Sequence, residues 1–356
     1  MTTVEGTPLL SLRNVTKRYP AQAMGGPLGS QLLAVDDVSL DVAAGETVGL
    51  VGESGCGKTT LTRVVLRLTD ATAGRIEFDG RDLVTLSRRQ MIPVRRDLQV
   101  ILQDPYASLN PRLRVHEIVA EPLVTHGRVR RGRAGARERR EMVSDLLRSV
   151  GLDPGLQDRY PHEFSGGQRQ RIGIARALAL DPRLVICDEA VSALDVSVQA
   201  QILQLLRRLQ QERGLSYLFV SHDLSVMRQI ADRIAVMYLG QIVEIADTEE
   251  LFTNPRHPYT QALLSAAPVA DPTVGRARRR IVLQGDPPSP VDPPTGCRFR
   301  TRCPLARPEC AEARPPLEPT GARGHVAACL FPVDSIAELA LAQDRRAGTQ
   351  PSTPDA

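Results

Sequence analysis

Nine consecutive residues fit a phosphate-binding pattern, and they constrain the fold more than any other part of the chain. They are Gly52, Glu53, Ser54, Gly55, Cys56, Gly57, Lys58, Thr59 and Thr60. The apolar run 47–51 predicts a strand before them, and residues 61–68 predict a helix after them. Glycines let the backbone wrap closely around an anion, and the helix N-terminus points free N–H groups at it. The pattern therefore predicts an α/β P-loop fold, with Lys58 on the outer phosphates and Thr59 ligating Mg²⁺.

The use of lysine supports this role for Lys58. The chain contains 45 Lys and Arg residues, of which only Lys17 and Lys58 are lysines. Arginine supplies the positive charge everywhere else, and a flat guanidinium does not replace a compact ammonium inside a phosphate loop. A Gly-rich turn without a ligand is the alternative interpretation of this motif taken alone.

Length and composition set broad limits on the protein. A chain of 356 residues can bury a large core and suggests two or three domains. The net charge of +4 is too small to argue for nucleic acid. No apolar run approaches the length needed to cross a bilayer, and Met1 to Leu10 lacks a charged-then-apolar leader. These features predict a cytoplasmic protein that reaches a membrane only through a partner.

The order of apolar and helical patterns predicts the domain organisation. Strands are expected at residues 9–19, 32–51, 76–78, 98–102, 184–187 and 217–220. Helical periodicity fills residues 104–180 and predicts a helical subdomain inserted between strands of the domain that holds the phosphate loop. Residues 266–335 are rich in Pro, Arg and Cys and predict a small loop-rich extension, and residues 336–356 predict a disordered tail.

Two adjacent acidic residues follow the apolar run 184–187. Asp188 is expected to ligate Mg²⁺, and Glu189 to act as the base that activates the attacking water. This position suits both roles because the carboxyl ends of buried parallel strands form the ligand edge of an α/β sheet. Two solvated turn residues are the alternative.

A second anion-binding pattern stands at the start of a predicted helix. It consists of Ser165, Gly166, Gly167 and Gln168. A second phosphate site without its own lysine makes sense if it faces a nucleotide held by another chain. At these residues the sequence resembles the ATP-binding cassette (ABC) family, whose signature is this tetrapeptide. The resemblance covers residues 9 to about 265, with the motifs in the family's order.

The resemblance implies roles for further residues. Tyr19 would stack on adenine, although a strand aromatic packed in the core is the alternative. Gln103 would reach Mg²⁺ and the attacking water, and His222 would be the switch histidine at the γ-phosphate. Asp195 would end a loop that crosses the seam of a dimer with two sandwiched ATP molecules. Ala190 departs from the family, which commonly has Pro after the catalytic Glu, and this departure is expected to affect only loop stiffness.

Three further segments resemble the oligopeptide/dipeptide importer branch, and its second ATPase subunit type in particular. They are residues 103–112, residues 254–260, and the tail motifs at 287–290 and 297–304. The resemblance implies a peripheral ATPase on the cytoplasmic face of the cell membrane. Its partners would be a paralogous or identical ATPase subunit, two transmembrane permease subunits and, indirectly, an extracytoplasmic solute-binding protein. Nickel chelates, sugars and drugs remain alternatives to peptides as the cargo.

The tail contains four of the six cysteines: Cys297, Cys303, Cys310 and Cys329. Four thiols in a short cytosolic segment suggest a four-thiolate site for an iron–sulfur cluster or for zinc. The spacing is not the short Cys-x2-Cys of zinc ribbons, which favours a cluster of the [4Fe-4S] type. Reduced cysteines without a metal are the alternative.

Two other features of the sequence bear on its possible partners. The Arg-rich residues 128–140 predict a solvated helix or loop, and the sharper alternative is attraction to an anionic membrane surface. A soluble ABC ATPase acting on nucleic acid is the alternative function class. Such proteins typically carry two fused cassettes or a long coiled-coil insertion, and this chain shows one phosphate loop and neither feature, so no nucleic acid partner is expected.

Overall fold

The computed structural model describes residues 7–24, 29–104, 108–130, 132–266, 281–283, 285–321 and 324–333. Parts of several predicted segments lie outside these residues. They are 25–28 of the insertion at 20–30, 105–107 of the stretch 103–112, Arg131, residues 267–280, 284, 322–323 and 334–335 of the extension, and the whole of 336–356.

The larger sheet places the phosphate loop at the carboxyl end of a buried parallel strand. Within the described residues it has eight strands, in the order β11-β12-β10-β9-β3-β8-β7-β6. Their bounds are β3 Thr47–Val51, β6 Leu98–Ile101, β7 Leu184–Asp188, β8 Ser216–Ser221, β9 Arg233–Tyr238, β10 Gln241–Asp247, β11 Glu318–Pro319 and β12 Val326–Ala327. The strands from β6 to β9 pair in parallel, and β3, β7 and β8 are buried along their whole length because both faces are covered.

A second, antiparallel sheet covers one face of the first, with helix α1 (Lys58–Val65) between them. Its strands are β1 Leu10–Pro20, β2 Gln31–Val42, β4 Ala73–Phe78 and β5 Arg81–Asp82. Residues of β8 alternate between the two cores: Leu218 and Val220 pack toward α1, whereas Tyr217 and Phe219 face the helices on the other side. The phosphate loop is therefore anchored by a strand and a helix that are both buried.

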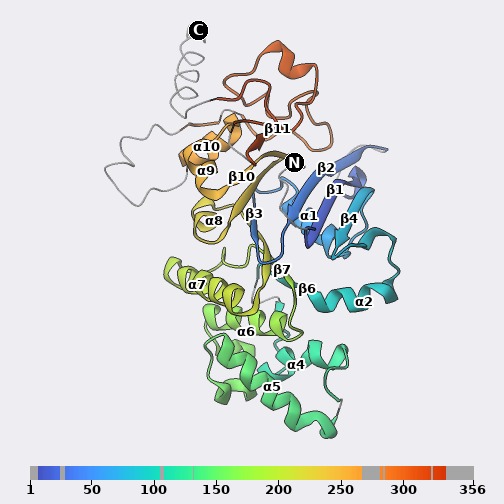
Figure 1. Ribbon diagram of the computed structural model, residues 1–356, viewed down its shortest axis with the longest axis vertical. Coiled ribbons are helices and arrows are strands. Elements are labelled where there is room, and N and C mark those ends of the chain that lie inside the picture. Colours follow the sequence, from blue (N-terminus) through green and yellow to red (C-terminus); the bar gives the residue numbers. More distant parts are fainter. Residues whose placement is uncertain are drawn as a thin grey trace, which may run out of the picture.

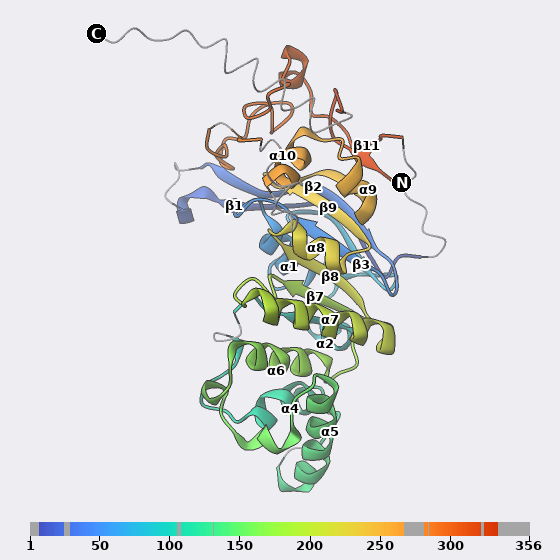
Figure 2. The same cartoon turned by 90° about the vertical axis from the view of Figure 1, so that its left-hand side faces the viewer.

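Helices between β6 and β7 form a separate block. They are α4 Val115–Thr125, α5 Ala136–Ser149 and α6 Gly166–Leu178. The other α-helices are α2 Arg88–Asp97, α7 Val196–Arg213, α8 Leu224–Ile230, α9 Thr248–Thr253 and α10 Pro258–Ala266. Short 3₁₀ turns lie at Ala21–Met24, Leu83–Thr85, Arg133–Gly135, Pro154–Asp158, Pro161–Glu163 and Pro308–Ala311. In Figures 1 and 2 the block with α4 and α5 projects from one end of the molecule, and the C-terminal extension lies at the other.

Several arginines of the run 128–140 make contacts within the helical block. Arg139 donates to the carbonyl oxygens of Arg130 and Gly132, and Arg140 pairs with Asp158. Such local pairing favours the solvated-face interpretation over a dedicated membrane-binding patch.

The C-terminal extension is loop-rich, as expected, yet it is docked on the main sheet. Strand β12 pairs with β10, and β11 pairs with β12. Beside this junction, Nε2 of His325 lies 2.7 Å from Oε1 of Glu244, and both side chains are almost fully buried. Glu244 also accepts the backbone N–H groups of Arg256 and His257. One buried carboxylate therefore ties the extension to the start of α10.

The ion pair at His325 makes this docking sensitive to pH. Burial alone would lower the pKa of His325, but Glu244 and Glu250 outweigh burial and raise it. The stabilisation by the charged imidazole is complete below the ordinary His pKa of about 6.5 and is lost as the pH rises through the raised value.

We therefore expect the extension to open more readily as the pH rises from the ordinary His pKa of about 6.5 through the raised pKa of His325. Protection factors from hydrogen exchange of residues 318–321 and 324–327, corrected for the chemical exchange rate at each pH, measure this opening. His325→Gln should remove the pH dependence of these protection factors over this range, whereas His126→Gln, in the helical block, should leave it in place. An equal slope in wild type and His325→Gln would contradict the assignment.

Candidate ATP-binding site

Two glycines allow the phosphate loop to pass close to neighbouring backbone. A Cβ atom on Gly52 would lie 2.1 Å from the carbonyl oxygen of Met237, and one on Gly57 would lie 2.2 Å from that of Ala34. Gly57 also has a φ of 111°, which disfavours other residues. The loop is therefore clamped between β2 and β9, and only glycine fits at either point.

Lys58 begins helix α1 and folds back into the loop. Its Nζ donates to the carbonyl oxygen of Gly52 at 2.7 Å and to that of Glu53 at 3.0 Å. The side chain is only 4% exposed, so the ammonium has few alternatives to these oxygens and to an incoming phosphate. Cys56, beside it, is buried and has its pKa raised mainly by burial, which agrees with a packing role.

Oxygen donors suited to Mg²⁺ meet at the end of β7. Oδ1 of Asp188 lies 3.5 Å from the Thr59 hydroxyl, and Oδ2 lies 3.3 Å from the Thr62 hydroxyl. Burial raises the pKa of Asp188, and a bound cation would favour its ionised form. A hydroxyl and a carboxylate beside a phosphate loop fit the hard-oxygen preference of Mg²⁺. The ion would neutralise phosphate charge there, with Thr59, Asp188 and Gln103 as the predicted holding groups.

The predicted catalytic side chains converge on Glu189. Nε2 of Gln103 donates to its Oε2 at 2.7 Å, and Nδ1 of His222 lies 3.4 Å from its Oε1. Glu189 has a φ of 50°, an uncommon backbone conformation for a residue that is not glycine, and its N–H donates to the Val220 carbonyl oxygen. This backbone turn directs the carboxylate toward the groups from two other loops. Ala190 behind it is buried.

A cavity of about 700 Å³ joins these groups to the phosphate loop. It is lined by Tyr19, Leu32, Leu33, Ala34, residues 53–60, Gln103, Glu189, residues 238–240 and residues 287–290. Tyr19 is half-buried at the wall of this cavity, so its ring is not enclosed in the core. The ammonium of Lys17 lies 4.7 Å from the ring centroid.

The Ser-Gly-Gly-Gln residues and Asp195 do not line this cavity. Ser165 and Gln168 form a reciprocal cap at the start of α6. A Cβ on Gly167 would lie 2.5 Å from Val198 of α7, so close helix packing requires a glycine there. Asp195 stands at the N-cap position of α7, without a capping hydrogen bond from its side chain. The second predicted anion site is therefore separate from the first within one chain.

The structure adds residues that the motifs did not indicate. Residues 287–290 of the extension line the cavity, and the Pro290 carbonyl oxygen accepts the N–H of Leu33. Arg302 pairs with Glu53, and the Tyr259 hydroxyl accepts the Glu53 N–H. The sequence showed these segments as motifs, but their position against the phosphate loop depends on contacts between distant parts of the chain.

Comparison with known proteins agrees with this geometry. Residues 35–192 match the ABC transporter family, and residues 243–310 match the oligopeptide/dipeptide transporter C-terminal region. The oligopeptide transport ATP-binding protein OppF of Salmonella typhimurium is 53% identical over 84% of this chain and 88% of its own length. The protein AppF of Bacillus subtilis is 50% identical over 92% of this chain and 99% of its own.

The chain belongs to the ABC transporter family of ATP-binding proteins. A solved dimeric ATP-binding cassette, in a post-hydrolysis state with ADP and Pi, matches with a TM-score of 0.59 at 31% identity and covers 67% of this chain and 98% of its own. The P-loop fold and ATPase activity expected from the sequence are thereby confirmed, and ATP is the nucleotide bound. The roles of individual site residues stay predictions.

The ABC assignment makes Glu189 the residue to test. Glu189→Gln keeps the shape and the contact with Gln103 but removes the base. We expect ATP affinity to be retained and the hydrolysis rate to fall roughly 10²–10⁴-fold. Steady-state phosphate release, with ATP binding measured in parallel, checks both. Near-normal hydrolysis would contradict the assignment, and Glu212→Gln on the outer face of α7 is the matched control.

Proposed function

We propose that this protein is the ATP-hydrolysing motor of a peptide importer. The observation that carries the proposal is the docking of an oligopeptide/dipeptide-type C-terminal extension directly on the nucleotide cavity of an ABC domain. Relatives over most of the chain bear the name oligopeptide transport ATP-binding protein. Among the described residues no helix is long and apolar enough to cross a bilayer. Transport then requires separate permease subunits, with this subunit peripheral on the cytoplasmic face.

Two nucleotide-binding subunits complete the site. The signature at Ser165–Gln168 lies outside the cavity of its own chain and is therefore available to the nucleotide of a partner. The partner is a paralogous or identical ATPase subunit. A γ-phosphate that bridges two chains favours the closed dimer, and its loss on hydrolysis favours the open one. Each round of ATP binding and hydrolysis therefore closes and reopens the dimer.

A groove provides the contact with a permease. It has a volume of about 220 Å³ and lies between the end of α1, the α2–β6 junction and α4. Leu68 lines it and is 64% exposed, which is unusual for a leucine beside an apolar groove. Strand β6, on the same groove, leads directly to Gln103 at the ATP site. A permease segment seated here would sense the state of Gln103.

The transport proposal is tested by separating hydrolysis from uptake. Leu68→Glu puts a charge into the groove, and a lost contact of about 2 kcal/mol would weaken permease binding roughly 30-fold. We expect ATP hydrolysis by the isolated subunit to stay unchanged while uptake of labelled oligopeptides in the assembled transporter falls. Val282→Glu, at another exposed apolar residue, is the control. Peptide uptake that survives Leu68→Glu would contradict the docking site, and uptake of nickel chelate, sugar or drug alone would contradict the cargo.

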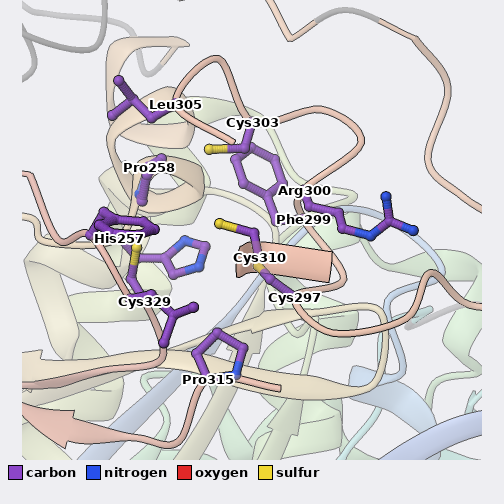
Figure 3. A pocket seen from close by; sticks show the side chains of 12 residues that line it. His257, Pro258, Cys297, Phe299, Arg300, Cys303, Leu305, Cys310, Pro315 and Cys329 are labelled. Carbon is purple, nitrogen blue, oxygen red and sulfur yellow. The ribbon is translucent and has the colours of Figure 1, made fainter. Parts of the chain in front are cut away.

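We further propose that the tail cysteines hold a metal, with an iron–sulfur cluster as the first expectation and zinc as the alternative. All four line one small cavity together with His257, Phe299 and Arg300 (Figure 3). Burial, and then the neighbouring thiols, raise the pKa of Cys303 and of Cys329 to about 12. Buried protonated thiols that line one cavity would gain from a cation that displaces their protons.

The four thiols line one cavity, but at their present spacing they are too far apart to hold one metal ion. Across the part of the chain that is described, no three His, Cys, Asp or Glu side chains are close enough to hold one metal ion. Metal binding therefore requires the thiol side chains to rotate inward. Their convergence from four points of a loop-rich segment supports the proposal, because a metal would supply the cross-links that such a segment otherwise lacks.

Anaerobically purified protein should be brown and contain iron and labile sulfide in equal amounts. Each of the variants Cys297→Ser, Cys303→Ser, Cys310→Ser and Cys329→Ser should lose the colour, whereas Cys187→Ser, in the core of β7, should keep it. Colourless protein with one zinc per chain would establish the zinc alternative. Protein without metal under these conditions would leave four reduced cysteines.

A further inference from the structure

The segment between Cys297 and Cys303 connects the thiol cavity to the ATP site. The ring of Phe299 lies 5.3 Å from that of Tyr238 and 5.4 Å from that of Tyr259, centroid to centroid. Arg298 pairs with Asp36 at 2.6 Å, next to the β2 edge of the nucleotide cavity. This short segment is therefore packed against the walls of the ATP site and not merely tethered to the domain.

Arg302 makes the closest connection. Its Nη1 donates to Oε2 of Glu53 at 2.8 Å, and its Nη2 donates to Oε1 at 3.1 Å. The arginine side chain is 8% exposed and the glutamate side chain 26%. Such a forked pair fixes both partners in orientation as well as in distance. Glu53 belongs to the phosphate loop, so an arginine of the extension holds a residue of the loop itself.

The Arg302–Glu53 pair bears on nucleotide binding because Glu53 carries a negative charge. A carboxylate in a loop that receives the phosphates of ATP opposes binding, because like charges repel in a partly buried site. The guanidinium of Arg302 cancels that charge. The backbone of Glu53 is also held: its N–H donates to the Tyr259 hydroxyl at 2.9 Å, and its carbonyl oxygen accepts from Lys58.

We infer that Arg302 is a positioning residue for the phosphate loop, which neutralises Glu53 and makes nucleotide affinity depend on docking of the cysteine-rich extension. Arg302 precedes Cys303 in the chain, so whatever fixes that cysteine also fixes the fork. The dependence on docking stands on the Arg302–Glu53 geometry alone. Its control by a metal rests on the four-thiol site proposed above.

A double-mutant cycle that removes the two charges of the Arg302–Glu53 pair, here called the charge cycle, tests the inference. Arg302→Gln leaves Glu53 uncompensated beside the phosphates, and we expect the Kd for ATP to rise roughly tenfold. Glu53→Gln removes the repulsive charge while Arg302 keeps its own, so we expect the Kd for ATP to fall below the wild-type value. The double variant should recover most of the affinity lost in Arg302→Gln. Titration with a fluorescent ATP analogue gives all four values, and the deficit of Arg302→Gln should shrink at high salt.

The same cycle separates this role from general support of the fold. Arg314→Gln removes another arginine that joins the extension to the domain, at Asp36 and Asp37, away from the phosphate loop. It should leave the Kd for ATP unchanged. Normal affinity in Arg302→Gln would overturn the inference. So would a double variant no better than Arg302→Gln, because loss of packing, unlike loss of neutralisation, is not rescued by removing Glu53.

The proposed connection between the thiols and the ATP site is tested by combining Cys303→Ser with Arg302→Gln. Cys303→Ser should weaken ATP binding when Arg302 is present and should add nothing to Arg302→Gln. Metal content is measured on each sample. Absence of metal from wild type would overturn the four-thiol site and leave the charge cycle intact, whereas additive effects of the two substitutions would overturn the connection between Cys303 and Arg302.

Discussion

The close approach of three backbone segments at the phosphate loop is the constraint on which the site depends. Gly52 touches the carbonyl of Met237 on β9, and Gly57 touches that of Ala34 on β2. Because β9 belongs to the parallel sheet and β2 to the antiparallel one, the loop can form only where the two sheets meet. Burial of α1 between the sheets then fixes the direction of the helix N-terminus that faces the phosphates.

Local pattern was enough to predict the parts of the site that follow strands. The strand before Asp188 and the loop around Lys58 are both encoded by neighbouring residues, and the structure places them as expected. Gln103 and His222 were predicted from the family resemblance, and the structure brings both to Glu189. The left-handed backbone of Glu189 had no such signal, because the contacts that hold it come from the neighbouring strand β8.

The tail marks the limit of prediction from sequence. Its cysteines lie far along the chain from His222, the last of the ATP motifs, and nothing in that separation predicts a contact with the ATP site. The structure instead places Arg302 on Glu53 and residues 287–290 on the wall of the nucleotide cavity. No periodicity or motif spacing reports such a contact. It follows from β12 joining β10 and from the buried Glu244–His325 pair, and both are long-range features.

The proposed contacts would place two kinds of control on one ATP site. From the helical block, the groove at Leu68 leads along β6 to Gln103 and so to the catalytic carboxylate. From the opposite end, the extension reaches Glu53 in the same loop that holds Lys58. In this proposal the first contact would bear on hydrolysis and the second on binding, since Gln103 contacts the predicted base Glu189 while Arg302 contacts a charged residue of the phosphate loop. An importer motor built this way would let its permease set the rate of the cycle while the cysteine-rich extension decides whether nucleotide enters it.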